Sequence, residues 1–158
     1  MPAGTTRTSR TSPGQAVIQR KPPLRRPIRP TDSDEAYERV LRDIGSLSTL
    51  PEGWDSYKGA PISKEAQNRA TAFIITLLTH LDWRVPPPTV GPSPTGGVVL
   101  RWISSRYDVM LNFLPEGGEY SVVDLQVNEV LDEGLIGRPE SVIRDVINRF
   151  LPKESDEP

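Results

Sequence analysis

The side chains able to carry acid–base chemistry are few in this sequence. His80 is the only histidine, and the absence of cysteine excludes disulfides and thiolate metal sites. A lone imidazole needs a nucleophile or an orienting carboxylate beside it. An enzyme would have to combine His80 with Glu52 and Asp55 around Trp54. We expect no catalytic residue, because a position near a helix end favours a surface role for His80.

Carboxylates gather again in the second half of the chain, where pairs of them could bind Mg²⁺ or Ca²⁺. Their spacing matches no calcium-binding loop, so a solvated, solubilising surface is the more ordinary interpretation. We therefore expect neither a metal site nor a cofactor. The residues are Asp124, Glu129, Asp132 and Glu133.

The connector over residues 48–62 is the most distinctive stretch, because it combines Trp54 and Tyr57 with Asp55 and several glycines. Aromatic side chains on such a loop can contact another protein, which makes these three the candidate partner-binding residues. Alternatively, Trp54 plugs one end of the core and Asp55 accepts hydrogen bonds from its own loop. The usual burial of large aromatic residues favours this alternative.

Charge is divided unevenly along the chain. Residues 1–31 hold seven bases and no acid, whereas the other 127 residues hold 12 bases and 21 acids. Prolines and small polar residues predict that this basic segment is a disordered arm. The arm could neutralise nucleic-acid phosphates, bind its own acidic body or an acidic partner, or be inert. Its candidate nucleic-acid-binding residues are Arg20, Lys21, Arg25, Arg26 and Arg29.

Helical spacing of apolar residues predicts helices over 33–46 and 64–81, and a last helix between Pro139 and Pro152. Ser63 is a suitable N-cap for the second helix. No apolar stretch approaches the 18 or so residues that cross a membrane. No secretory signal is evident either, so we expect a cytoplasmic protein.

Period-2 alternation of apolar residues predicts an antiparallel sheet between the second and last helices. The expected strands are an edge strand at 89–91 and longer strands at 98–103, 107–114 and 119–127. The expected connections are turns at Gly96-Gly97, 104–106 and 115–118, and an acidic connector over 129–137.

The fold class predicted from these elements is α+β. We expect a three- or four-stranded antiparallel meander with one face covered by helices, in the order α-α-β-β-β-α. The domain division is a disordered basic arm at 1–31, a single domain at 32–152 and a frayed charged tail at 153–158.

Several short motifs follow one another between residues 50 and 115. They are Gly53-Trp54-Asp55-Ser56-Tyr57, Pro61-Ile62-Ser63, Pro87-Pro88, Pro94-Thr95-Gly96-Gly97 and Trp102. In this pattern, GWDxY…PIS…PP…PxxGG…W, the chain resembles a set of small uncharacterised bacterial proteins. The resemblance implies a common fold and no particular activity.

The sequence is best interpreted as a non-enzymatic protein–protein interaction module. By analogy it would be a co-encoded regulator or accessory protein, antitoxin-like or phage-defence-like. The alternative is a nucleic-acid-associated protein that binds phosphates through the basic arm.

Overall fold

A computed structural model describes residues 30–80 and 85–151 of the chain, and only the backbone of residues 30–33. The predictions for residues 1–29 and 152–158 therefore lie outside the described residues. The elements are α1 (Pro30–Ser46), η2 (Leu47–Thr49), α2 (Lys64–His80), β2 (Thr89–Pro92), β3 (Val98–Ile103), β4 (Tyr107–Leu114), β5 (Gly117–Asp124), β6 (Glu129–Leu135), α3 (Pro139–Val142), η3 (Ile143–Ile147) and α4 (Asn148–Phe150).

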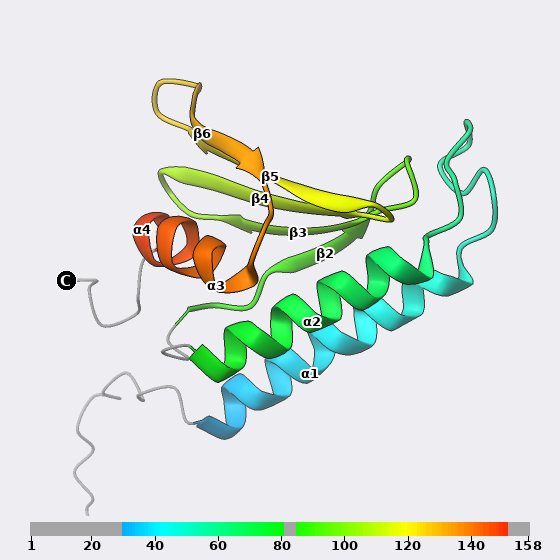
Figure 1. Cartoon of the computed structure of the whole chain (residues 1–158), viewed down its shortest axis with the longest axis horizontal. Helices are drawn as coiled ribbons and strands as arrows, with labels where there is room; N and C mark the ends of the chain where they lie inside the picture. Colours follow the sequence, from blue (N-terminus) through cyan, green and yellow to red (C-terminus); the bar gives the residue numbers. More distant parts are fainter. Residues whose placement is uncertain (1–29, 81–84, 152–158) are drawn as a thin grey trace, which may run out of the picture.

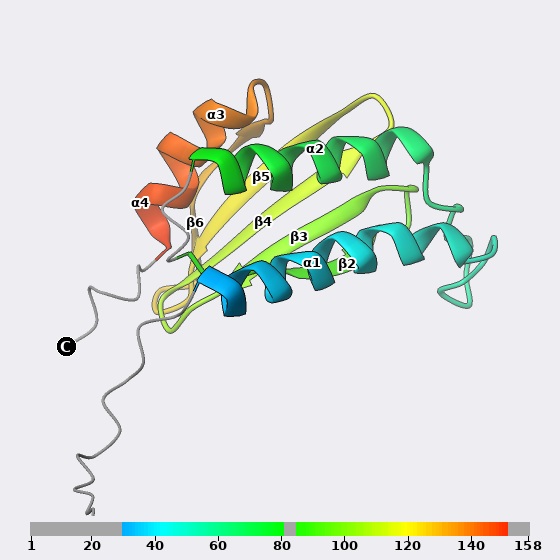
Figure 2. The same ribbon diagram turned by 90° about the horizontal axis from the view of Figure 1, so that it is seen from below.

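The five strands form one antiparallel sheet in the order β2-β3-β4-β5-β6. Each strand pairs with its neighbour in sequence, as expected for a meander. The helices all lie on one face of this sheet, with α1 and α2 side by side (Figures 1 and 2). The α+β class, the meander and the single helix-covered face are thus confirmed.

The core fills the space between the helices and the covered face of the sheet, and α2 contributes a central part of it. Alternate residues of β4, from Val109 to Phe113, are buried, as period-2 patterning predicts. The ring of Phe73 meets that of Phe113 at a centroid distance of 5.5 Å. Residues of α2 that are buried there are Ala66, Ala70, Phe73, Ile74 and Leu77.

The prediction of three or four strands was wrong, because the acidic stretch expected to be a connector contains a fifth strand, β6. None of its residues is buried, and the half-buried ones, Asp132 and Gly134, are not apolar, so the sequence lacks the apolar–polar alternation that marks a half-buried strand. A register shift between Val122 and Val123 also leaves Leu131 without a partner on β5. This bulge breaks the period of two in β6 itself.

The helix order also differs from the expected one. A short 3₁₀ helix, η2, follows α1, and the last helix contains a π-helical turn between two α-helical pieces. The expected turn at 115–118 is tighter, because Gly117 and Gly118 already pair with β4. No helix among the described residues is long and apolar enough to cross a membrane.

Truncating Phe73 tests the core directly. Phe73→Ala leaves a cavity at a position with no exposed surface, so we expect a loss of about 2–5 kcal/mol in the free energy of unfolding. Ile75→Ala, on the exposed side of α2, is the matched control and should stay within about 0.5 kcal/mol of wild type. Urea unfolding of the full chain measures both, and equal midpoints would contradict this core.

Candidate protein-interaction site

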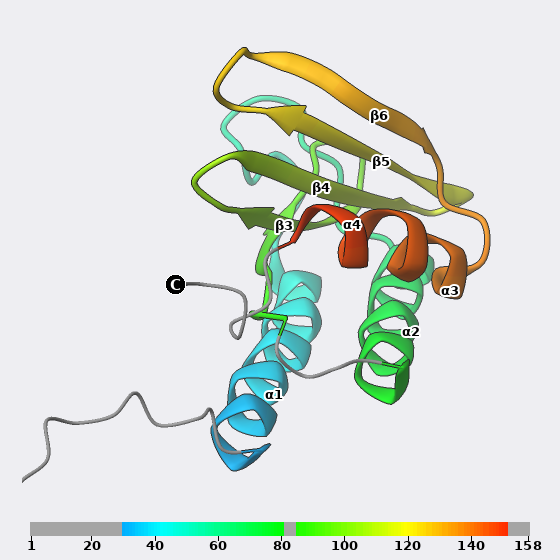
Figure 3. The same ribbon diagram turned by 90° about the vertical axis from the view of Figure 1, so that its left-hand side faces the viewer.

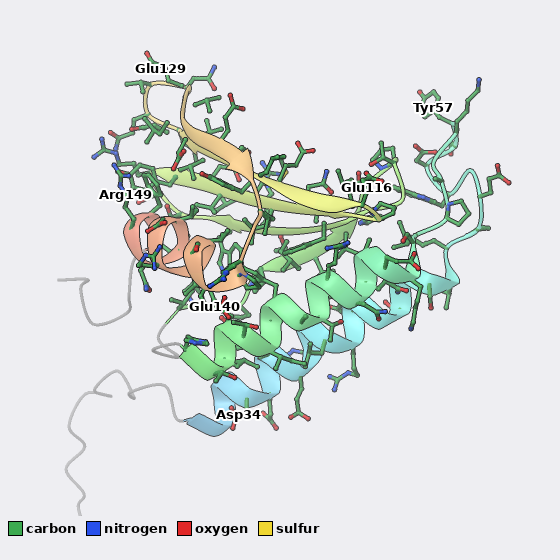
Figure 4. The ribbon with its side chains drawn as sticks, viewed as in Figure 1. Asp34, Tyr57, Glu116, Glu129, Glu140 and Arg149 are labelled. Carbon is green, nitrogen blue, oxygen red and sulfur yellow. The ribbon has the colours of Figure 1, made fainter. Side chains whose placement is uncertain are left out.

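The connector between η2 and α2 projects from the end of the helix pair, and its residues 53–59 are here named the Tyr57 loop (Figure 4). The backbone closes this loop on itself. The N–H of Gly53 donates to the carbonyl of Gly59 at 2.7 Å, and the N–H of Ser56 donates to the carbonyl of Gly53 at 2.9 Å. The loop is therefore a closed, hydrogen-bonded structure.

The carboxylate of Asp55 binds backbone N–H groups of its own loop. Its Oδ1 accepts hydrogen bonds from the backbone N–H of Tyr57 at 3.0 Å and of Gly59 at 2.8 Å. These two donors lower the pKa of the Asp55 carboxyl, because they stabilise its charged form. The charged carboxylate thus replaces backbone partners that a tight loop cannot supply.

Trp54 closes the base of the loop. Its indole Nε1 donates to the carbonyl of Ala60 at 2.9 Å. Gly59 lies between the two side chains. A Cβ atom on Gly59 would lie 2.8 Å from Cγ of Asp55 and 2.9 Å from Nε1 of Trp54, so glycine is required by close packing.

Two backbone hydrogen bonds fix the residues directly after the loop to the body of the protein. The N–H of Ala60 donates to the carbonyl of Pro94, and the N–H of Ser63 to that of Gly96, both at 2.9 Å. Both acceptors lie in the turn between β2 and β3. The Oγ of Ser63 also accepts from the N–H of Ala66, which confirms Ser63 as the N-cap of α2.

Tyr57 is the residue that this scaffold exposes. Its side chain is 85% exposed, the largest exposed aromatic area among the described residues. Figure 4 places it at the outer tip of the loop. Ser56, directly before it, has a φ of +69°, a left-handed conformation that costs a non-glycine residue about 1–3 kcal/mol. Such strain is concentrated at functional sites in proteins.

The structure separates the three candidate partner-binding residues by role. Asp55 accepts hydrogen bonds from its own loop, as the alternative interpretation predicted. Trp54 is half-buried within the loop and is not part of the described core, so it does not plug the sheet. The role of Gly59, which leaves room for the side chains of Asp55 and Trp54, was not predicted from the sequence. The motifs Pro61-Ile62-Ser63 and Pro94-Thr95-Gly96-Gly97 meet at this corner, where the N–H of Ser63 donates to the carbonyl of Gly96.

The structure does not bring the conceivable catalytic residues together. His80 ends α2, a helix of 17 residues and therefore about 25 Å long, whereas Glu52 and Asp55 precede its other end. An open groove of about 660 Å³ at the start of β2 and the end of β3 is lined by Pro86, Trp102 and hydroxyl-bearing residues. Arg101 also lines this groove, and its guanidinium donates a hydrogen bond to the carboxylate of Asp108.

The acidic residues of the second half do not form a metal site within the described part of the chain. Asp124 is buried at the end of β5, where Oδ1 accepts from the N–H of Gln126 at 2.9 Å. Its Oδ2 accepts from Nε of Arg106 at 3.2 Å. The hydrogen bond from Gln126, followed by the interaction with Arg106, lowers the pKa of Asp124. Asp124 thus stabilises the turn before β6.

No protein-family model, no curated protein and no solved structure matches the chain.

Replacing Asp55 tests the hydrogen-bonded loop. In Asp55→Ala the N–H groups of Tyr57 and Gly59 lose their acceptor, so their amide exchange should quicken by at least about tenfold, the factor that 1.4 kcal/mol represents. The exposed Glu52→Ala is the control on the same connector. Hydrogen exchange followed by NMR measures both variants, and unchanged rates in Asp55→Ala would show that the carboxylate does not order the loop.

The pKa of Asp124 predicts a pH dependence of stability. Because its folded-state pKa is lowered, the stability it adds is present above its unfolded pKa of about 3.9 and is lost as the pH falls through the folded value. Asp124→Asn should therefore be less stable at neutral pH and should lose less stability below about pH 4. Thermal unfolding across pH measures this, with the exposed Glu116→Gln as control; identical pH profiles for wild type and Asp124→Asn would contradict the assignment.

Proposed function

We propose that this chain is a non-enzymatic protein-binding module that contacts another protein through Tyr57. Trp54 and Asp55 serve the same site by holding the loop in its binding conformation. The observation that carries the proposal is an aromatic side chain 85% exposed on a loop that is hydrogen-bonded internally and is followed by residues hydrogen-bonded to the body. A co-encoded regulator or accessory protein fits this description.

The energetics of association support a role for such a loop. Tyrosine is among the residues that contribute most to protein interfaces, because it buries a large rigid area and still forms a hydrogen bond. A loop already ordered in the free protein avoids the entropic cost of ordering on binding. Lys58, which follows Tyr57 in sequence, and Glu52, which precedes the loop, are both exposed and can supply polar contacts at the rim of such an interface.

The test is recovery of a stoichiometric partner by the tagged full chain from its native host, compared with the variant Tyr57→Ala. We expect a partner whose affinity falls by about tenfold or more in Tyr57→Ala, a loss typical of an interface residue that contributes strongly. Ile75→Ala removes an exposed apolar residue elsewhere and should bind like wild type.

Two outcomes would contradict the proposal. One is the absence of any stoichiometric protein partner. The other is a partner that binds wild type, Tyr57→Ala and Ile75→Ala with equal affinity, which would place the interface away from the Tyr57 loop.

A further inference from the structure

Strand β6 is a free edge of the sheet. It forms the uppermost border of the molecule in Figure 3, and within residues 30–80 and 85–151 only β5 pairs with it. The opposite edge strand, β2, is short, carries Pro92 and contacts α1. An edge strand presents unpaired backbone N–H and C=O groups, to which another extended segment can be added.

Exposed apolar side chains are concentrated at this edge. Of the nine large apolar residues exposed in the described part of the chain, five lie between residues 125 and 135. Three of them lie on β6 and two in the turn before it, and exposed apolar groups of this kind mark interaction surfaces. The five are Leu125, Val127, Val130, Leu131 and Leu135.

The charges on β6 restrict which strand can pair with it. The strand carries Glu129, Asp132 and Glu133 and no base. Two copies of β6 pairing with each other would bring six carboxylates together, and facing like charges destabilise a strand pair. Asp132 lies opposite Val122 on the helix-covered side, and Glu133 opposite Ser121 on the open side. A basic strand can therefore find acids on both faces.

The chain itself contains a segment with the complementary properties. Residues 1–29, which end where α1 begins, carry seven bases and no acid. Within them, residues 14–21 contain no proline and are flanked by Pro13 and Pro22. This stretch contains the strand-favouring Val17 and Ile18, followed by Arg20 and Lys21.

We propose that residues 14–21 of a second copy of this chain pair with β6 as an added strand, so that two copies exchange their basic segments. The apolar residues of the segment cover those of the β6 edge, while Arg20 and Lys21 meet its acids. Reciprocal exchange closes the assembly at two copies, because each β6 receives one segment.

The length of the connection favours a second copy over the same one. Residues 22–29 include three prolines, and eight residues in a polyproline-type conformation span about 25 Å. The α1 helix contacts β2, which lies about 19 Å from β6 at roughly 4.8 Å per strand spacing. A connection within one copy would also have to pass around the helix layer. Residues 22–29 would then have no length to spare.

Analytical ultracentrifugation of the full chain tests the proposal by exchange of charges. We expect a dimer whose dissociation constant rises about tenfold or more in Arg20→Glu/Lys21→Glu, and equally in Glu129→Lys/Glu133→Lys. A chain that carries all four substitutions should dimerise again, because opposite charges then face each other once more. Glu116→Lys/Glu140→Lys makes the same change in net charge at exposed sites away from β6 and is the matched control (Figure 4).

Hydrogen exchange in the same samples identifies the segment. Slow exchange of amides in residues 14–21 and in β6 of the dimer supports the proposal. A monomer at every concentration, a dimer affected equally by the control, or failure of the fourfold variant to dimerise would overturn it. Binding of the basic segment to duplex DNA while β6 amides exchange freely would also overturn it. Tyr57→Ala should leave the dimer intact, which separates this proposal from the proposed function.

Discussion

Burial of one sheet face under α2 is the interaction on which the rest of the structure depends. Phe73 and Leu77 have no exposed surface, and they anchor the helix against β3 and β4. Because the opposite face of the sheet has no helix, its strands keep polar and exposed residues there.

Buried polar groups fasten the other segments to that core. Nε2 of Gln67, on α2, donates to the carbonyl of Ile44 at 2.9 Å and satisfies the C-terminal end of α1. The hydroxyl of Tyr37 donates to the carbonyl of Val85 at 2.9 Å, and burial raises the pKa of this hydroxyl. Both hydrogen bonds link α1 to later parts of the chain. Because the Tyr57 loop connects η2 to α2, the hydrogen bonds that fix α1 against α2 also help to fix the position of the loop.

The sequence was sufficient for elements with strong periodicity and insufficient where the period fails. Apolar residues at every second position made β3 and β4 recognisable. The apolar stripe of α2 predicted the bounds of that helix to within one residue. β6 was missed because an edge strand with a bulge shows no alternation. The role of Trp54 could not be read either, since its partner, the carbonyl of Ala60, belongs to the backbone and leaves no mark in composition. Asp55 was predictable, because short carboxylates commonly accept hydrogen bonds from their own turns.

The central claim is that the Tyr57 loop is ordered before any partner arrives. Backbone ¹⁵N relaxation of the free full chain measures this most directly. Order parameters near 0.85 for residues 53–59, as in the rigid backbone of β4, are the predicted result. Values below about 0.6 across the same residues would contradict it, because the hydrogen bonds of Asp55 and Trp54 would then not hold Tyr57 in place.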